Sequence, residues 1–317
     1  MPPSRHATVR IDLTRVRRNA EAVRAAAGVP IIAVVKADAY GLGAAAVAKT
    51  LADLVDGFYV FDLAEAVAYD LRSTGRRTIA LWAESHDPAD YLVHKVQPAV
   101  WSPDVAAALA KASPILSVET GQQRFGLPVT DAAGIDAVLA AAGGAIGEAF
   151  THATRPDQAV ALTAALRGKV PKLHAAGTAL IEQDPAAALD AVRPGLALYR
   201  GAVRTAARLV EVTDSNGPAG YTGFSAPRHG VILAGYSHGL RAGPCVVNGR
   251  RTRLLEVGMQ SAFVECGPED RVGDEVALLG DGVAEQDVAA AWGCTPHEVV
   301  LRMCAMGAAA YVGDRGA

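Results

Sequence analysis

Short apolar segments alternate with alanine-rich stretches through the first two thirds of the chain. Eight apolar segments predict strands, at residues 31–35, 58–60, 78–81, 97–100, 115–118, 145–149, 172–175 and 191–196. The stretches between them predict helices, for example at residues 44–54, 63–73, 104–112, 132–142 and 157–167. Strands that are apolar throughout are typical of a parallel sheet covered on both faces. Eight strands that alternate with helices predict a closed (β/α) barrel.

An open, doubly wound sheet is the alternative that the same alternation allows, because strands are hard to count in a single sequence. No glycine-rich dinucleotide fingerprint follows any of the eight predicted strands, which counts against that alternative. Before these strands, a short alternating segment at residues 8–13 predicts one more strand. A helix is expected from there to about residue 27, with Asp12 or Thr14 as its cap.

The pattern changes after about residue 204. Short β-rich segments, separated by glycine, proline or asparagine turns, follow at residues 208–212, 231–235, 244–247, 253–257, 262–266 and 275–279. An Asn-Gly pair at residues 248–249 is a strong hairpin signal. Only one helix, at residues 283–292, is expected in this half.

The length of 317 residues suits one large barrel and a smaller module. We expect an α/β fold in which residues 12–205 form an eight-stranded (β/α) barrel of the TIM type. Residues 206–317 are expected to form a β-rich C-terminal domain, which the N-terminal strand within residues 1–11 joins.

Composition narrows the possible partners and compartments. The chain has 51% hydrophobic residues and a formal net charge of −3, with acidic and basic residues interspersed. Without a basic face or a long apolar run, neither nucleic acid nor a membrane is expected as a partner. The polar first ten residues do not resemble a signal peptide. The four cysteines lack paired spacing, so we expect reduced thiols in a cytoplasmic protein and no metal site.

Lys36 directly follows the first predicted barrel strand and precedes a loop with two glycines. In a (β/α) barrel this position lies at the C-terminal mouth, where such folds carry their active sites. A partly desolvated lysine has a lowered pKa and can form a Schiff base with a carbonyl. The alternative is a lysine that ends a strand and extends into solvent. The residues around Lys36 favour the first of these roles.

The segment 35–43, Val-Lys-Ala-Asp-Ala-Tyr-Gly-Leu-Gly, closely resembles the cofactor-binding motif of the alanine racemases. It differs mainly at Leu42, where that family usually has histidine. The resemblance implies that pyridoxal 5′-phosphate (PLP) is the cofactor and that Lys36 is its Schiff-base lysine. It also implies that Tyr40 binds the cofactor phosphate.

An arginine motif extends the resemblance. The segment 118–126 is similar to the family pattern Asp-Thr-Gly-Met-x-Arg-Leu-Gly, whose arginine contacts the phenolic oxygen of the cofactor and the substrate carboxylate. The resemblance therefore implies that Arg124 binds both groups. A guanidinium suits them because it offers several donors in a planar fork. Without the motif, an arginine at this position would be interpreted as a surface residue.

The segment 192–199 is similar to the family pattern Val-Arg-Pro-Gly-x-x-x-Tyr. The resemblance implies that Arg193 faces the pyridine nitrogen and that the amides of Gly195 and Leu196 hold the phosphate. Since arginine does not surrender its proton, the ring nitrogen stays unprotonated. The cofactor is then a weaker electron sink, which limits the lifetime of the carbanion and suppresses transamination.

Two histidines and a threonine match further family positions. His152 and His174 correspond to histidines behind the cofactor ring, although a single histidine at a strand end is more often structural. Thr178 lies where the family commonly has serine, which implies a hydroxyl donated to the phosphate.

The C-terminal half carries two more matches. Tyr236, within residues 234–239, resembles the tyrosine of Gly-Tyr-Ala-Asp-Gly, which is the second base of the racemases. Met259 corresponds to a methionine that lies beside the substrate. In the resembled family the second domain of one subunit closes the site of the other, which implies a homodimer with shared active sites. Proton transfer between Lys36 and Tyr236 on opposite faces of the substrate is then expected.

Departures from the family pattern concentrate around the substrate. Ser117 replaces a lysine, often carbamylated, that supports the active-site arginine, and Gln122 replaces a methionine. His238 and Gln260 replace aspartates, and Ala305 lies where relatives place an arginine. We therefore expect a PLP-dependent racemase that interconverts L- and D-alanine or a similar small amino acid. The alternatives are a racemase, epimerase or aldolase for another amino acid, or a PLP-binding relative without turnover.

Overall fold

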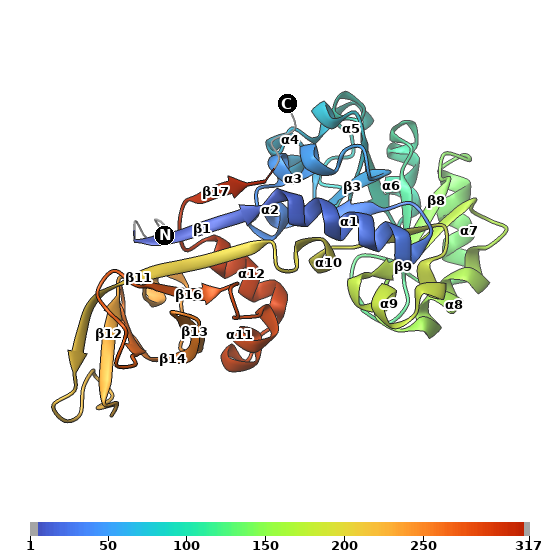
Figure 1. The fold of residues 1–317 in the computed structure, drawn as a ribbon. Coiled ribbons are helices and arrows are strands. Elements are labelled where there is room, and N and C mark those ends of the chain that lie inside the picture. The colour runs from blue at the N-terminus through green and yellow to red at the C-terminus, as the bar shows by residue number, and fades with distance from the viewer. Residues whose placement is uncertain (1–5, 314–317) are drawn as a thin grey trace. The chain divides into compact units, whose positions relative to one another are not determined.

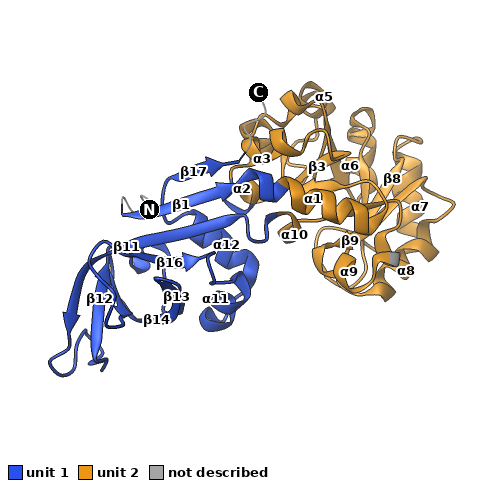
Figure 2. Cartoon of the chain, in the orientation of Figure 1, with its two compact units in different colours: residues 1–16, 40–42, 199–317 blue, residues 17–39, 43–198 orange. Residues whose placement is uncertain are grey.

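The computed structural model describes residues 6–313, which fall into two compact units. Of these residues, unit 1 comprises 6–16, 40–42 and 199–313, and unit 2 comprises 17–39 and 43–198 (Figure 2). Each unit has its own sheet.

Unit 2 contains a parallel β-barrel. Its strands, in spatial order, are β2 (Ile32–Val34), β3 (Gly57–Val60), β4 (Arg77–Ala80), β5 (Val96–Val100), β6 (Ile115–Glu119), β8 (Glu148–Ala153), β9 (Lys172–Gly177) and β10 (Ala191–Arg193) (Figure 1). A parallel bridge between Ile31 and Val192 closes the ring, and the Val34 N–H donates to the Pro194 carbonyl at 3.0 Å. The expected eight-stranded barrel is therefore confirmed.

Helices follow the strands of the barrel. They are α3 (Ala44–Leu51), α4 (Leu63–Ala68), α5 (Pro88–His94), α6 (Pro103–Ala108), α7 (Ala132–Ala141), α8 (Pro156–Leu166), α9 (Thr178–Gln183) and α10 (Leu196–Tyr199), with short 3₁₀ turns η1 (Leu71–Thr74), η2 (Ala110–Ala112) and η3 (Pro185–Ala188). The cap residue of several helices comes shortly after a strand and accepts a backbone N–H; such caps are Asp62, Asp87, Ser102 and Asp131. These side chains begin the helices where the strands end.

The sixth barrel strand begins later than the sequence pattern indicates. Residues 145–149 were expected, whereas β8 begins at Glu148 and extends to Ala153. Gly143 and Gly144 both have positive φ and form a turn after α7. Residues 145–147 belong to this connection and not to the strand. As a result His152 lies within β8 rather than after it, and His174 lies in the middle of β9.

Unit 1 contains an eight-stranded, mainly antiparallel sheet. Its strands are β1 (Ala7–Asp12), β11 (Val203–Asp214), β12 (Arg228–Ile232), β13 (Pro244–Val247), β14 (Arg250–Val257), β15 (Ala262–Glu265), β16 (Glu275–Leu279) and β17 (Ala309–Val312). Their spatial order is β12-β15-β14-β13-β16-β11-β1-β17. The N-terminal strand β1 pairs with β11 and β17, and the helix α1 (Leu13–Ala27) follows it. The expected β-rich second sheet is therefore confirmed.

The expectation of a single helix in the C-terminal half is wrong. The structure has two, α11 (Glu285–Trp292) and α12 (Pro296–Cys304), and a 3₁₀ turn η4 (Tyr236–His238). Thr295 caps α12 by accepting the Glu298 N–H at 3.3 Å, and Pro296 occupies its first turn. This Thr-Pro-x-Glu sequence is a helix-start signal that sequence reasoning overlooked.

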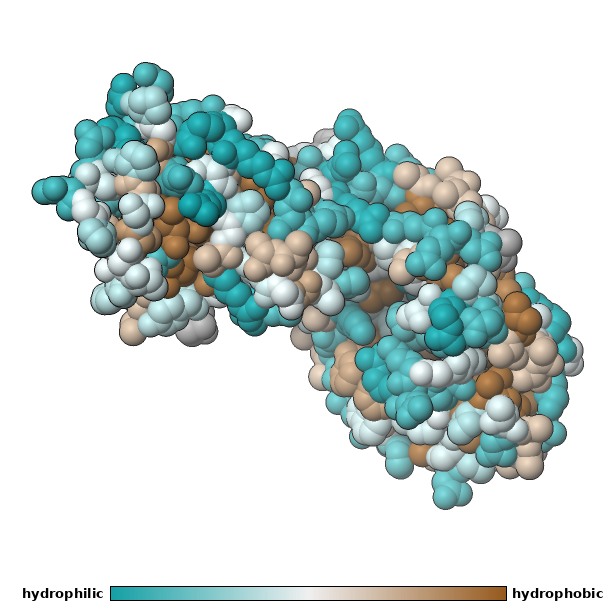
Figure 3. Space-filling view, turned by 90° about the horizontal axis from the view of Figure 1, so that it is seen from below, coloured by the Kyte–Doolittle hydropathy of each residue, from teal (hydrophilic) through white to brown (hydrophobic). Residues whose placement is uncertain are grey.

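No helix within residues 6–313 combines the length and the apolar composition that crossing a bilayer requires. On the face shown in Figure 3, hydrophilic residues cover much of the surface and hydrophobic residues occupy smaller areas. The strands β2 and β3, by contrast, are buried along their whole length.

Candidate active site

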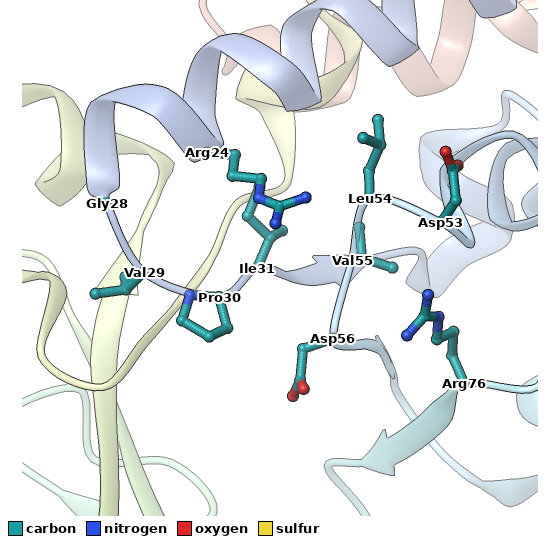
Figure 4. A pocket seen from close by; sticks show the side chains of 10 residues that line it. All are labelled: Arg24, Gly28, Val29, Pro30, Ile31, Asp53, Leu54, Val55, Asp56 and Arg76. Carbon is teal, nitrogen blue, oxygen red and sulfur yellow. The ribbon is translucent and has the colours of Figure 1, made fainter.

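A pocket of about 420 Å³ lies at the N-terminal ends of the first barrel strands (Figure 4). Its lining includes Ile31, Asp56 and Arg76, which immediately precede β2, β3 and β4. Lys36, Arg124 and Arg193 all lie at the opposite, C-terminal ends of strands. This pocket is therefore separate from the candidate site, because (β/α) barrels carry their chemistry at the C-terminal end.

Lys36 begins a left-handed turn. The segment Lys36–Tyr40, labelled α2 in Figure 1, has φ and ψ near +53° and +46° at Ala37, Asp38 and Ala39, and Tyr40 has φ +59°. Each non-glycine residue in this region costs roughly 1–2 kcal/mol. A run of such residues persists only where the surroundings impose it, and such strain concentrates at functional sites.

Side chains of α4 and its flanking loop impose this turn. Glu65 accepts the Ala37 N–H at 2.8 Å, and the Tyr69 hydroxyl accepts the Asp38 N–H at 2.9 Å. Asp38 in turn accepts the Ala44 N–H at 2.6 Å, at the start of α3. Hydrogen bonds at both ends of the turn therefore fix the path of the backbone after Lys36.

The pKa of Lys36 is lowered from its usual value. Burial is the main cause, and the positive charges of Arg124 and then Arg193 add to it. The carboxylate of Glu65 opposes them without cancelling them. A lysine whose neutral form is favoured in this way is suited to attack a carbonyl carbon.

Arg193 is buried and held by both of its terminal nitrogens. One donates to His174 Nδ1 and, at 3.1 Å, to the His174 carbonyl, and the other donates to the Thr151 carbonyl. Its guanidinium lies 4.9 Å from the ring centroid of Phe150. Among the described residues no hydrogen bond uses its Nε–H, which leaves that donor for a ligand.

A series of polar contacts continues from Arg193 into the barrel. His174 Nε2 lies 2.8 Å from Glu148 Oε1, and Glu148 pairs with Arg77. Burial and the charge of Arg193 lower the pKa of His174 to about 4. Burial alone would raise the pKa of Glu148, but His174 and Arg77 lower it to about 2. The sequence analysis identified His174 but missed Glu148 and Arg77, which come from other strands and carry no local motif.

Thr178 and Gly195 face one another next to His152. The Gly195 and Ala197 N–H groups both donate to Thr178 Oγ1, each at 3.1 Å. Because both lone pairs of this oxygen are engaged, its hydrogen is the group left to donate outward. His152 lies close to Gly177. A Cβ added at Gly177 would lie 3.5 Å from Cε1 of the His152 imidazole.

Arg124 lies in an exposed loop after β6. Its guanidinium is 5.5 Å from the ring centroid of Phe125, and its backbone N–H donates to Glu119 at 2.8 Å. Ser117, which replaces the family lysine, is buried and donates to the Phe125 carbonyl at 2.5 Å. The side chain of Ser117 thus contacts the backbone of the loop that carries Arg124.

Unit 1 brings the other two candidate residues together. The Tyr236 N–H donates to the Gly258 carbonyl and the Ser237 N–H to the Met259 carbonyl, both at 2.9 Å. Gly235 allows this approach, because a Cβ there would lie 2.4 Å from the Gly258 oxygen. Tyr236 is 54% exposed and Met259 is 61% exposed. His238, beside them, accepts the Gly235 N–H through Nδ1 at 3.2 Å.

Tyr40 also belongs to unit 1. Its ring packs against Tyr199, at a centroid distance of 5.1 Å, and against His297, at 5.5 Å. Burial raises the pKa of Tyr40 to about 12, so its hydroxyl keeps its proton and remains a donor at neutral pH. A neutral phenol is suited to donating a hydrogen bond to an anion such as a phosphate.

Comparisons with known proteins agree on one family. The family model "Alanine racemase, N-terminal domain" matches residues 11–203. The alanine racemase of Pectobacterium atrosepticum is 31% identical, with 96% of this chain and 98% of that protein covered. The biosynthetic alanine racemase of Pseudomonas aeruginosa superposes with a TM-score of 0.85 at 26% identity, covering 99% of this chain and 100% of that one. The alanine racemase of Bartonella henselae, solved with covalently bound pyridoxal phosphate, has the same fold, with a TM-score of 0.84 at 21% identity, covering 98% of this chain and 100% of that one.

Proposed function

The chain belongs to the alanine racemase family of amino-acid racemases, and we propose that it uses PLP to interconvert the L and D forms of alanine or a similarly small amino acid. The observation that carries this proposal is the position of Lys36. It lies two residues after the end of the barrel strand β2, its pKa is lowered, and the two cations that lower it are Arg124 and Arg193. These are the two arginines that the family motifs single out.

The side chains of unit 2 fit the proposed cofactor. Lys36 offers an amine with a lowered pKa to an aldehyde. The hydroxyl hydrogen of Thr178 and the Leu196 N–H are donors suited to a phosphate, whereas the Gly195 N–H, also expected there, already donates to Thr178. The free Nε–H of Arg193 suits a ring nitrogen. PLP, when bound, supplies the electron sink that allows the α-proton of an amino acid to leave.

Three residues of the chain, Arg124, Lys36 and Arg193, would have separate roles in the reaction. Arg124 binds the carboxylate of the amino acid and orients the α-carbon. Lys36 accepts the α-proton on one face or returns it there. Arg193 would hold the ring nitrogen with a donor that cannot give up its proton, which would keep the electron sink weak.

The second face requires a second base, for which we propose Tyr236 of the partner subunit. Tyr236 and Met259 lie side by side and are exposed in one subunit, as expected of residues that complete another subunit's site. The enzyme would then be a homodimer with shared sites. Mixing inactive Lys36→Ala and Tyr236→Phe proteins should restore part of the activity through hybrid dimers. No recovery despite demonstrated subunit exchange would contradict a shared site.

The function is tested by incubating the PLP-loaded protein with each amino acid in deuterated water. Exchange of the α-proton together with loss of chirality is expected for alanine or a similarly small amino acid, and Lys36→Ala should abolish both. Exchange with a larger amino acid alone would assign another substrate, and no exchange with any amino acid would contradict racemisation.

We also propose a cytoplasmic location, because all four cysteines are free thiols.

A further inference from the structure

The loop that carries Arg124 leaves strand β6 and returns to it at once. After residues 120–126, the short strand β7 (Leu127–Pro128) pairs in parallel with the end of β6, Val118 with Leu127 and Glu119 with Pro128. Gly126 permits this return, because a Cβ there would lie 2.9 Å from the Glu119 nitrogen. The loop is therefore anchored at both ends to the same strand.

The carboxylate of Glu119 closes the loop from one side. It accepts the Arg124 N–H at 2.8 Å through Oε2 and the Gly121 N–H through Oε1. Burial would raise the pKa of Glu119, but the backbone N–H groups of the loop lower it on balance. Glu119 is thus an ionised acceptor for several loop amides at once.

Ser117 holds the residue after the arginine. Its side chain is buried in β6, and its hydroxyl donates to the Phe125 carbonyl at 2.5 Å. Gln123 and Phe125, on either side of Arg124, both have left-handed φ values, of 56° and 51°. Non-glycine residues avoid this region, so the conformation depends on these hydrogen bonds.

The guanidinium of Arg124 has no carboxylate partner among the described residues. The Phe125 ring beneath it packs against Trp82 and Trp101, at centroid distances of 5.5 and 6.0 Å. Both tryptophans follow neighbouring barrel strands. The loop therefore presents a cation that no carboxylate within residues 6–313 neutralises.

We propose that Ser117 and Glu119 are positioning residues, which set the direction of Arg124 through the backbone on either side of it. This inference rests on the proposed function, in which Arg124 binds the substrate carboxylate. A side chain held from behind by its own backbone keeps its guanidinium fork free for the ligand. Neither residue is expected to touch the substrate or the cofactor.

The test compares Ser117→Ala and Glu119→Gln with Asp131→Asn as the matched control. Asp131 also accepts a backbone amide, that of Gly134 at 2.9 Å, but as the cap of α7 and not in the loop of Arg124. Both positioning variants should raise KM for the amino acid about tenfold, with a smaller change in kcat, and should weaken inhibition by propionate to a similar extent. Hydrogen exchange at residues 121–125 should accelerate in both, and the control should change neither KM nor this exchange.

These readouts separate the two proposals. If the wild-type protein racemises no amino acid, the proposed function fails, whereas amide exchange and calorimetric binding of propionate still test the positioning. Unchanged exchange at residues 121–125 and unchanged propionate affinity in both variants would overturn the inference. An equal rise of KM in Asp131→Asn would also overturn it, because the effect would then be general.

Discussion

The Nδ1 atom of His174 accepts a hydrogen bond from the guanidinium of Arg193. Arginine is only a donor, so this nitrogen carries no proton, and the proton of the neutral ring lies on Nε2, which faces Glu148 at 2.8 Å. The pKa of His174 accordingly falls to about 4, mainly through burial and then through the charge of Arg193. Protonation of His174 would break its contact with Arg193.

This contact predicts an acid-sensitive fold. Histidine titrates near 6.5 in an unfolded chain, so between about pH 6.5 and 4 the unfolded state binds more protons than the folded state. The contribution of His174 is fully present above about pH 6.5 and is lost as the pH falls toward 4, on the order of 3 kcal/mol in total. Denaturation of wild type at pH 7 and pH 5 should show about 2 kcal/mol of this loss. His174→Gln should flatten this dependence, whereas His86→Gln, at an exposed histidine, should not.

The ion pair between Glu148 and Arg77 lies at the far end of the series of contacts that begins at Arg193. Glu148 is buried between His174 and Arg77, so Glu148→Ala leaves the buried His174 Nε2 without its acceptor and leaves the half-buried Arg77 with Asp56 as its remaining carboxylate partner. We expect a loss of roughly 1–3 kcal/mol in the free energy of unfolding, the cost of an unsatisfied buried polar group. Asp53→Ala removes the exposed partner of Arg17 and should cost less than about 1 kcal/mol. Equal losses of unfolding free energy in the two variants would show that the burial of Glu148 does not determine how much its contacts stabilise the fold.

Much of the barrel could be predicted because its strands are apolar along their whole length. The segment 31–35 lies on β2 within one residue at each end, whereas both ends of β8 and the end of β10 are displaced by three or four residues. Sequence motifs also indicated Lys36, Arg124 and Arg193, since these residues lie in local patterns at strand ends.

What could not be predicted depends on contacts between distant segments. Glu148 and Arg77 lie 71 residues apart, and no local spacing signals their pairing. The left-handed turn after Lys36 was expected only as a loop, because Ala-Asp-Ala has no intrinsic preference for positive φ. Glu65 and Tyr69 impose that conformation from a different helix and loop.

The left-handed turn predicts an unusual response to glycine. Ala37→Gly should leave stability unchanged or raise it by up to about 1 kcal/mol, because glycine adopts φ near +52° without strain. Ala22→Gly, at an exposed position inside α1, should instead destabilise by about 1 kcal/mol. Urea denaturation of both variants makes the comparison. A loss of the same size at Ala37 would argue against a left-handed turn.

Thr178 is predicted to act on the phosphate of the cofactor. Thr178→Ala removes the acceptor of the Gly195 and Ala197 N–H groups and the hydroxyl hydrogen that remains to be donated. PLP affinity should fall roughly tenfold to a hundredfold, and Thr178→Ser should retain most of it. Titration with pyridoxal, which lacks the phosphate, provides the control. If both variants bound pyridoxal and PLP as wild type does, Thr178 would have no part in phosphate binding.

The position of Lys36 is the centre of this account, and borohydride reduction tests it most directly. The protein is loaded with PLP, reduced, digested and searched by mass spectrometry for the modified lysine. The modification is predicted on Lys36 alone, in the peptide that contains the left-handed turn, and Lys36→Arg should show none. Stoichiometric modification of another lysine, such as Lys49 or Lys95, with Lys36 unmodified, would contradict the proposed site.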